Sequence, residues 1–221
     1  MSSNNQTIYQ VFLRNYSQEG TFAALTKDLE RIKNLGIDIL YLMPLNEIGV
    51  QQRKGTYGSP YASKDYFSIS KDLGSLDDLK TLISKTHDLG MKIILDMVFH
   101  HTSPDNPLYL QHPEYYFHKD NGEPGNRVRD WSDIIDLETS REDTQEYLLQ
   151  VIDYWVSVGF DGFRFDVASL IDFRLFEKIR SKYGDDILLF AETIDPNFSD
   201  YIYKIGHYRI KDNKLFPVFD V

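Results

Sequence analysis

The sequence predicts an α/β protein whose parallel strands form part of a barrel. First, a unit of amphipathic helix, glycine and apolar strand recurs along the chain, and alternating helices and strands predict a parallel sheet. Second, the expected strands are apolar almost throughout, as in a sheet buried on both faces. Third, no glycine-rich phosphate-binding loop follows the first strand, which argues against an open dinucleotide-binding sheet.

Apolar runs mark the expected strands. They cover residues 8–13, 39–43, 92–98, 162–165, 187–191 and 215–219. A helix and then a glycine precede each strand from the second to the fifth, and glycine is the residue that favours the end of a helix. These glycines are Gly36, Gly90, Gly159 and Gly184.

Four amphipathic helices are expected between the strands. The first covers residues 22–35, and the second opens at Ser75 with Asp78 three positions later, a capping-box pattern. The third opens at residues 140–143, and the fourth ends before Gly184. Apolar residues recur at helical spacing in all four. They are Leu25, Leu29, Ile32, Leu79, Ile83, Tyr147, Leu148, Val151, Tyr154, Trp155, Val158, Leu175, Phe176, Ile179 and Tyr183.

Two connections are unusually long, over residues 44–71 and 100–139. Both leave the carboxyl end of a strand, where barrel enzymes place their active sites, and loops of this length are usually functional. We expect residues 100–139 to form a small inserted subdomain. The barrel would then comprise residues 1–99 and continue over residues 140–221.

Composition narrows the function classes. The chain has 221 residues, is 42% hydrophobic and carries a net charge of −10, which argues against a nucleic-acid partner. It contains no cysteine, so disulfides and cysteine-based metal sites are excluded. No apolar run approaches the roughly 18 residues of a membrane span. Together with the polar start of the chain, this predicts a cytoplasmic protein.

Two carboxylates lie at the ends of expected strands, and they are the most informative feature of the sequence. Asp166 ends the run Gly-Phe-Arg-Phe-Asp, and Glu192 ends Leu-Leu-Phe-Ala-Glu. An ionised carboxylate in an apolar setting is costly unless it is paired. Two acids held on a rigid scaffold are the usual apparatus for cleaving a glycosidic bond.

Arg164 and Asp166 should lie on the same side of their strand, because side chains alternate along a strand. We expect Arg164 to lower the pKa of Asp166 and to keep this nucleophile ionised. The apolar residues before Glu192 would favour its protonated form, as a proton donor requires. The alternatives are a structural ion pair for Asp166 and a loop-facing glutamate for Glu192.

Two further segments carry candidate binding residues. His100 and His101 follow the strand that contains Asp96, but neighbouring strand residues point in opposite directions, so a metal site is not indicated. Aromatic residues between Tyr57 and Tyr66 could stack on a sugar ring, although loop packing is the preferred explanation for Tyr57 and Tyr66 themselves.

The order and spacing of these segments resemble the α-amylase family, glycoside hydrolase family 13. The matching segments are Asp96–His101, Ile135–Leu137, Gly162–Asp166 and Ala191–Glu192. The resemblance spans nearly the whole chain and implies an α-amylase-type (β/α)8 TIM barrel. This chain would hold about six β/α units of it, with a small inserted loop domain after the third strand.

The resemblance implies a role for each site residue. Asp166 occupies the nucleophile position and Glu192 the acid/base position. Tyr61 matches a tyrosine that stacks on the sugar at the cleavage point, where His101 and Asp96 would also bind substrate. The expected partner is an α-glucan oligosaccharide or polysaccharide, and the chemistry requires no cofactor. The sequence does not indicate an oligomeric state.

Two departures from the family pattern matter. His100 replaces an asparagine that helps to bind calcium in many members, so the sequence does not support a calcium site. The family also uses a third acid at the end of its seventh strand, and this chain ends at Val221. A complete barrel needs about 250 residues. We therefore expect a piece of a longer enzyme, inactive by itself.

The sequence thus predicts a retaining glycoside hydrolase that acts on α-glucosidic bonds of starch-like substrates by double displacement. An alternative is a transglycosylase or isomerase acting on sucrose, trehalose or maltose with the same two acids. An alternative of another class is a non-catalytic binding protein that keeps the fold without the chemistry.

Overall fold

The computed structural model describes residues 6–128 and 130–193. Its centre is a parallel sheet of β1 (Ile8–Val11), β2 (Ile39–Leu42), β3 (Lys92–Met97), β6 (Gly162–Phe165) and β7 (Leu188–Ala191), adjacent in that order. Every pair is parallel, which confirms the predicted α/β architecture. The strand expected over residues 215–219 lies outside the described residues.

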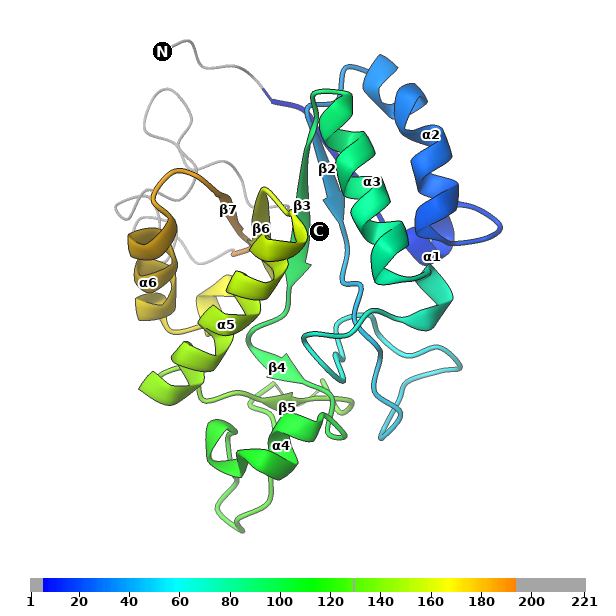
Figure 1. Ribbon diagram of the computed structural model, residues 1–221. Helices are drawn as coiled ribbons and strands as arrows, with labels where there is room; N and C mark the ends of the chain where they lie inside the picture. Colours follow the sequence, from blue (N-terminus) through cyan, green and yellow to red (C-terminus); the bar gives the residue numbers. More distant parts are fainter. Residues whose placement is uncertain (1–5, 129, 194–221) are drawn as a thin grey trace.

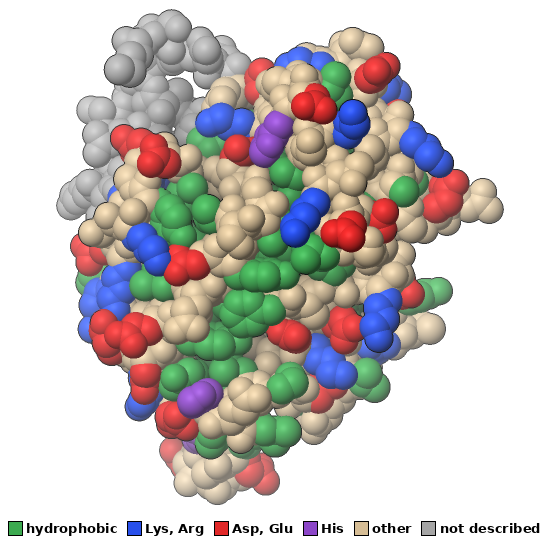
Figure 2. Space-filling model, in the orientation of Figure 1, with side chains coloured by type: hydrophobic (Ala, Val, Ile, Leu, Met, Phe, Trp, Pro, Cys, Tyr) green, Lys and Arg blue, Asp and Glu red, His purple; other side chains and the backbone are tan. Residues whose placement is uncertain are grey.

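The long helices lie together on one side of this sheet (Figure 1). They are α2 (Phe22–Asn34), α3 (Leu76–Asp88), α5 (Glu142–Val158) and α6 (Phe173–Tyr183). The predicted capping box is present at the start of α3, where Ser75 and Asp78 each bond the other's backbone N–H. Acidic and basic side chains are interspersed over the outer face of the helices, around a central group of apolar ones (Figure 2).

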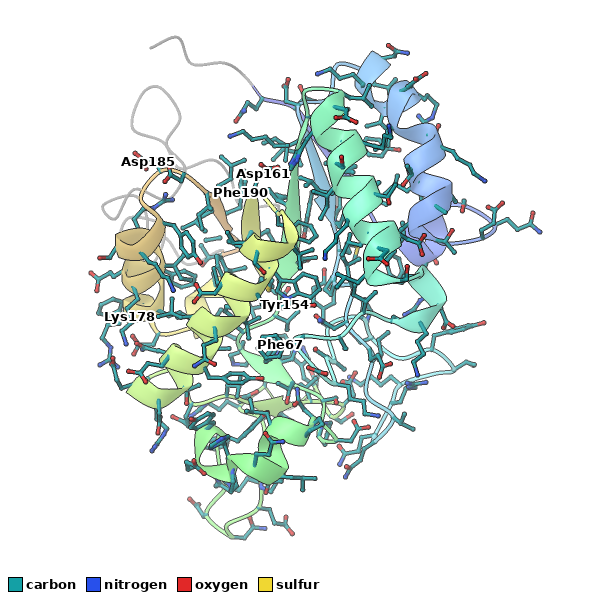
Figure 3. The ribbon with its side chains drawn as sticks, in the orientation of Figure 1. Phe67, Tyr154, Asp161, Lys178, Asp185 and Phe190 are labelled. Atoms are coloured by element: carbon teal, nitrogen blue, oxygen red, sulfur yellow. The ribbon has the colours of Figure 1, made fainter. Side chains whose placement is uncertain are left out.

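Two of these apolar side chains mark the seam between α3 and α5. Phe67, from the long connection after β2, packs edge-to-face on Tyr154 of α5 at a centroid distance of 5.3 Å, and Figure 3 shows the pair side by side. The NH of Trp155 reaches the backbone carbonyl of Tyr66 at 2.9 Å. The connection is thereby fixed to the helix layer.

Side chains alternate between the two faces of the sheet, and this alternation positions the site. Along β2, Leu40 and Leu42 pack in the main core toward the helices, whereas Ile39 and Tyr41 belong to a small inner cluster. Ile94 of β3 is in the same inner cluster. Residues two positions apart on a strand share a face of the sheet. Polar side chains two positions from Tyr41 or Ile94 on the same strand therefore point away from the helices.

The connection after β3 forms a small unit with its own two-stranded sheet, and its buried apolar residues join the main core. It contains β4 (His101–Thr102), α4 (Pro107–Gln111), the 3₁₀ turn η2 (Pro113–Tyr115) and β5 (Ile135–Asp136). Strands β4 and β5 pair antiparallel. The sequence did not predict these elements, because each is too short to show a periodic pattern of apolar residues.

The other differences are local. The first strand ends at Val11, and Leu13 begins a short helix α1 (Leu13–Tyr16), so the predicted extension to residue 13 is wrong. Short 3₁₀ turns η1 (Lys71–Leu73) and η3 (Ala168–Leu170) were also not predicted. No helix within the described part of the chain combines the length and apolarity needed to cross a bilayer.

Candidate active site

One guanidinium contacts three carboxylates at the carboxyl ends of neighbouring strands. Nη1 of Arg164 lies 2.7 and 3.0 Å from the two oxygens of Asp96 and 3.0 Å from Oδ1 of Asp166. Its Nη2 lies 2.8 Å from Oε1 of Glu192. The arginine, Asp96 and Asp166 are all buried. The two acids singled out in the sequence thus meet at one cation.

Sheet register explains this meeting. Asp96 on β3 is the register partner of Arg164 on β6, and both side chains point to the face opposite the helices. Beyond the strand ends the ladder continues, because Asp166 N–H donates to the carbonyl of Met97 and Glu192 N–H to that of Phe165, at 2.9 and 3.0 Å. The parallel ladder therefore holds Asp166 and Glu192 level with each other, whereas Asp96 lies two residues earlier, level with Arg164.

Val167 joins the two acidic residues through its backbone. Its φ of 40° and ψ of 46° are left-handed, which is rare for a β-branched residue. In that conformation its N–H donates to Oε2 of Glu192 at 2.9 Å. The N–H of Ala168 donates to the carbonyl of Glu192 at 2.8 Å. Strain of this kind persists only where the surrounding structure enforces it.

The pKa of Asp166 differs from the sequence-based expectation. Burial and the neighbouring charge of Asp96 raise its pKa to about 7, and the attraction of Arg164 does not offset them. Arg164 does lower this pKa, as predicted, but the net shift is upward, so the prediction of a low pKa for Asp166 is wrong. It considered one cation and one acid, whereas three carboxylates share the guanidinium in a buried setting. Burial also raises the pKa of Asp96.

The surroundings of Glu192 differ as well. The sequence predicted an apolar environment, but its carboxylate contacts the guanidinium of Arg164 and the N–H of Val167. The apolar residues before it belong to the strand, and the strand ends before the side chain reaches the cavity. In this conformation Glu192 is arranged as a hydrogen-bonded carboxylate.

Two tyrosines complete the shell around Asp96. Tyr41 OH donates to Oδ2 of Asp96 at 2.6 Å, and Tyr61 OH donates to the same oxygen at 3.2 Å. Tyr61 was expected at the site from its motif. Tyr41 was not, although its in-phase position with the buried residues of β2 could have indicated an inward side chain.

A cavity of about 350 Å³ opens beside the acids. It is lined by Lys54, Ser59, Tyr61, His101, Trp131, Asp133, Ile134, Asp166, Val167 and Glu192. Four of the predicted residues lie on its wall, while Asp96 and Arg164 lie behind them. Lys54, Trp131 and Asp133 were not predicted from the sequence. They lie in loops, where no periodic pattern indicates the direction of a side chain.

The two long connections meet at the cavity wall. Nζ of Lys54 lies 2.9 Å from Oδ1 of Asp133 and 3.0 Å from the carbonyl of Asp130. Trp131 packs edge-on against the rings of His100 and His101, with centroids 5.9 and 5.5 Å away. Lys54 comes from the connection after β2, and the other residues belong to the unit after β3.

Comparison with known families agrees with this geometry. The family model for the catalytic domain of α-amylase matches residues 1–134 and 128–208. The chain belongs to the α-amylase family. An α-amylase from Lactobacillus plantarum, solved by crystallography, superimposes with a TM-score of 0.83 at 43% identity, over 94% of this chain and 50% of that one.

Other relatives in the α-amylase family are named for different activities. The maltogenic α-amylase AmyB of Thermotoga neapolitana matches with a TM-score of 0.83 at 38% identity, over 91% of this chain and 48% of its own. An α-1,4-glucan:maltose-1-phosphate maltosyltransferase of Chlorobaculum tepidum is 27% identical over 91% of this chain. The chain spans 34% of that relative. It therefore represents about a third to a half of these relatives' length.

Calcium, which binds in many members of the α-amylase family, does not fit the residues around His100. Asp136 is the nearby buried acid, and its Oδ2 accepts the Arg127 N–H at 2.7 Å. The Arg127 guanidinium and Nε2 of His100 each lie 3.7 Å from the same oxygen. The other oxygen of this carboxylate, Oδ1, has no hydrogen-bond partner among the residues described. Across the residues described, no group of three or more His, Asp or Glu side chains is arranged to hold a metal ion.

His101 is prepared for hydrogen bonding. Burial lowers its pKa to about 3, and His100 adds to the effect, so the ring stays neutral near pH 7. Its Nδ1 lies 3.0 Å from Nδ1 of His100, and one of these nitrogens must donate to the other. If Nδ1 is the acceptor on His101, its Nε2–H is a donor.

Proposed function

We propose that the protein containing this chain is a retaining glycoside hydrolase that acts on α-glucosidic bonds of maltooligosaccharides or starch. The observation that carries the proposal is the placement of Asp166 and Glu192 on the wall of one cavity, both contacting Arg164. Two carboxyl groups beside a sugar-sized space match the requirement of this reaction.

Asp166 would attack the anomeric carbon and form a glycosyl-enzyme intermediate. Glu192 would donate a proton to the leaving oxygen, and then take a proton from the water that releases the sugar. Arg164 would orient both acids. Tyr61 and His101 would bind the sugar at the cleavage point, and Asp96, behind the cavity wall and held by Tyr41, would position Tyr61 through their hydrogen bond. These steps involve side chains only and require no cofactor.

The test uses the full-length protein and maltotriose. Proton NMR should show products that first appear with the α-configuration, because a double displacement retains it. Asp166→Asn and Glu192→Gln should each lower kcat by roughly a thousandfold. Asp77→Asn, on the exposed start of α3, is the matched control. Products with the β-configuration, or wild-type rates in either site variant, would refute the mechanism.

A glycosyl transferase is the second candidate. It is favoured by the relatives named as maltose-1-phosphate maltosyltransferases. The two acids would act in the same way, but a sugar hydroxyl would replace water in the second step. Incubating the full-length protein with maltose 1-phosphate and maltohexaose distinguishes the reactions. A transferase lengthens the glucan and releases phosphate, whereas a hydrolase shortens maltohexaose and ignores the phosphate ester.

A non-catalytic binding protein is the candidate from another class. It would bind maltooligosaccharides without turnover, and the same maltotriose assay identifies it by unchanged substrate. The presence of both acids argues against a non-catalytic protein, because Asp166 and Glu192 each form an ion pair with Arg164.

A further inference from the structure

A second cavity, of about 270 Å³, lies at the carboxyl end of β1 beside the connection that follows β2. None of its lining residues lines the cavity of Asp166 and Glu192. Four of them are cationic: Arg14, Arg53, Lys64 and Lys71. Two are acidic: Glu47 and Asp72. The wall therefore carries an excess of positive charge, in a chain whose net charge is −10.

Acidic side chains offset the charges of these four cations only in part, as where Lys64 lowers the pKa of Asp105. Within the described part of the chain, none of them forms an ion pair, although most other arginines do. Both Arg14 and Lys64 are half-buried, so their charges are less screened than those on an open surface. Incompletely neutralised cations around one cavity attract an anion from solution.

Arg14 is held in place by aromatic rings and not by an acid. Its guanidinium carbon lies 5.3 Å from the ring centroid of Phe12 and 5.4 Å from that of Tyr57. Cation–π contacts of this kind orient a guanidinium but leave its N–H groups unbonded. The fork of donors on Arg14 therefore remains available to a ligand.

Arg53 is fixed by backbone carbonyls. Its Nε donates to the carbonyl of Gly49 at 2.7 Å, and its Nη2 donates to that of Ile48 at 2.9 Å. Its Nη1 donates no hydrogen bond to any of the residues that the structure describes. The fit around this side chain requires Gly58, whose φ is +75° and where a Cβ would lie 2.9 Å from Cγ of Arg53. Both arginines are thus positioned before any ligand arrives.

We infer that this cavity binds a phosphate group, through Arg14 and Arg53 with Lys64 and Lys71 as supporting charges. The paired N–H donors of a guanidinium match the spacing of phosphate oxygens, and the lysine ammonium groups add positive charge. Two sources share this chemistry, free inorganic phosphate and a phosphorylated sugar. The inference concerns a separate site and does not depend on the proposed reaction.

The experiment titrates the full-length protein with inorganic phosphate by isothermal calorimetry, at low ionic strength and pH 7. We expect saturable binding at one site. The variant Arg14→Gln/Lys64→Gln should weaken it at least about tenfold, because two charge-assisted contacts are lost. The control Lys80→Gln/Lys92→Gln removes the same charge elsewhere and should change affinity less than twofold.

A second titration uses glucose 6-phosphate. Binding at least tenfold tighter than that of phosphate assigns the site to a sugar phosphate, and equal affinity assigns it to free phosphate. Absence of saturable phosphate binding overturns the inference, as does equal weakening in both double variants. If the double variant does not fold by circular dichroism, Arg14→Gln alone is compared with Lys80→Gln alone.

Discussion

The backbone N–H of Val167 donates a hydrogen bond of 2.9 Å to Oε2 of Glu192. The residue that follows the proposed nucleophile therefore holds the proposed acid. The N–H points at Glu192 because Val167 is left-handed, a conformation that valine rarely adopts. The geometry of the two acids is thus coupled through one strained peptide.

We expect Val167→Gly to be more stable than Val167→Ala by about 1 kcal/mol, because glycine accepts positive φ and alanine does not. Both variants lose most of the valine side chain, so their difference isolates the backbone. Urea denaturation measures it. If the alanine variant is the more stable one, Val167 carries no backbone strain.

The pH dependence of kcat/KM should reflect Asp166. Its pKa of about 7 means that the carboxyl is protonated below pH 7, and only the ionised form can attack. We therefore expect kcat/KM to rise as pH increases through about 7. The measurement is a profile on maltotriose between pH 5 and 9. A flat profile would show that Asp166 is ionised throughout.

Asp96→Asn should move this rise to lower pH, because it removes a negative charge that raises the pKa of Asp166. The shift should be on the order of one pH unit. The rate itself will also fall, since Asp96 is in the site, so the position of the rise is the informative quantity. The control Asp77→Asn should leave it unchanged. A shift to higher pH would contradict the electrostatic account.

Arg164→Met should destabilise the fold by about 3 kcal/mol at pH 8, because three carboxylates lose their shared cation. Without it the folded-state pKa values of Asp96 and Asp166 lie further above their unfolded values, so protonation of these two groups favours folding. The loss should shrink as the pH falls toward 5. Denaturation of the variant and wild type at pH 5 and 8 tests this. An equal loss at both pH values would indicate lost packing alone.

Lys54→Ala should raise the KM for maltotriose severalfold and leave kcat within twofold. It breaks the contact with Asp133 that joins the two long connections at the cavity wall, away from the bond that reacts. Stability should change by less than about 1 kcal/mol, because the lysine is half exposed. Lys80→Ala is the control. A loss of kcat without a change in KM would contradict this role.

The amino-acid sequence was enough to place the two acids and Arg164 at one edge of the sheet. Periodicity and glycines located the strands and helices, and alternation put Arg164 and Asp166 in phase. The strand-end position indicated Glu192, and the resemblance to the α-amylase family implied Asp96, Tyr61 and His101. These features are local, so a linear pattern is enough to reveal them.

The surroundings of Asp166 and Glu192, by contrast, became known only from the folded chain. The pKa of Asp166 depends on burial and on Asp96, which lies on another strand, and the contacts of Glu192 depend on the bend at Val167. Tyr41, Lys54 and Trp131 reach the site from segments far apart in the chain. Charge interactions and desolvation depend on distance in space and not on position in the sequence, so they become visible only when the chain is folded.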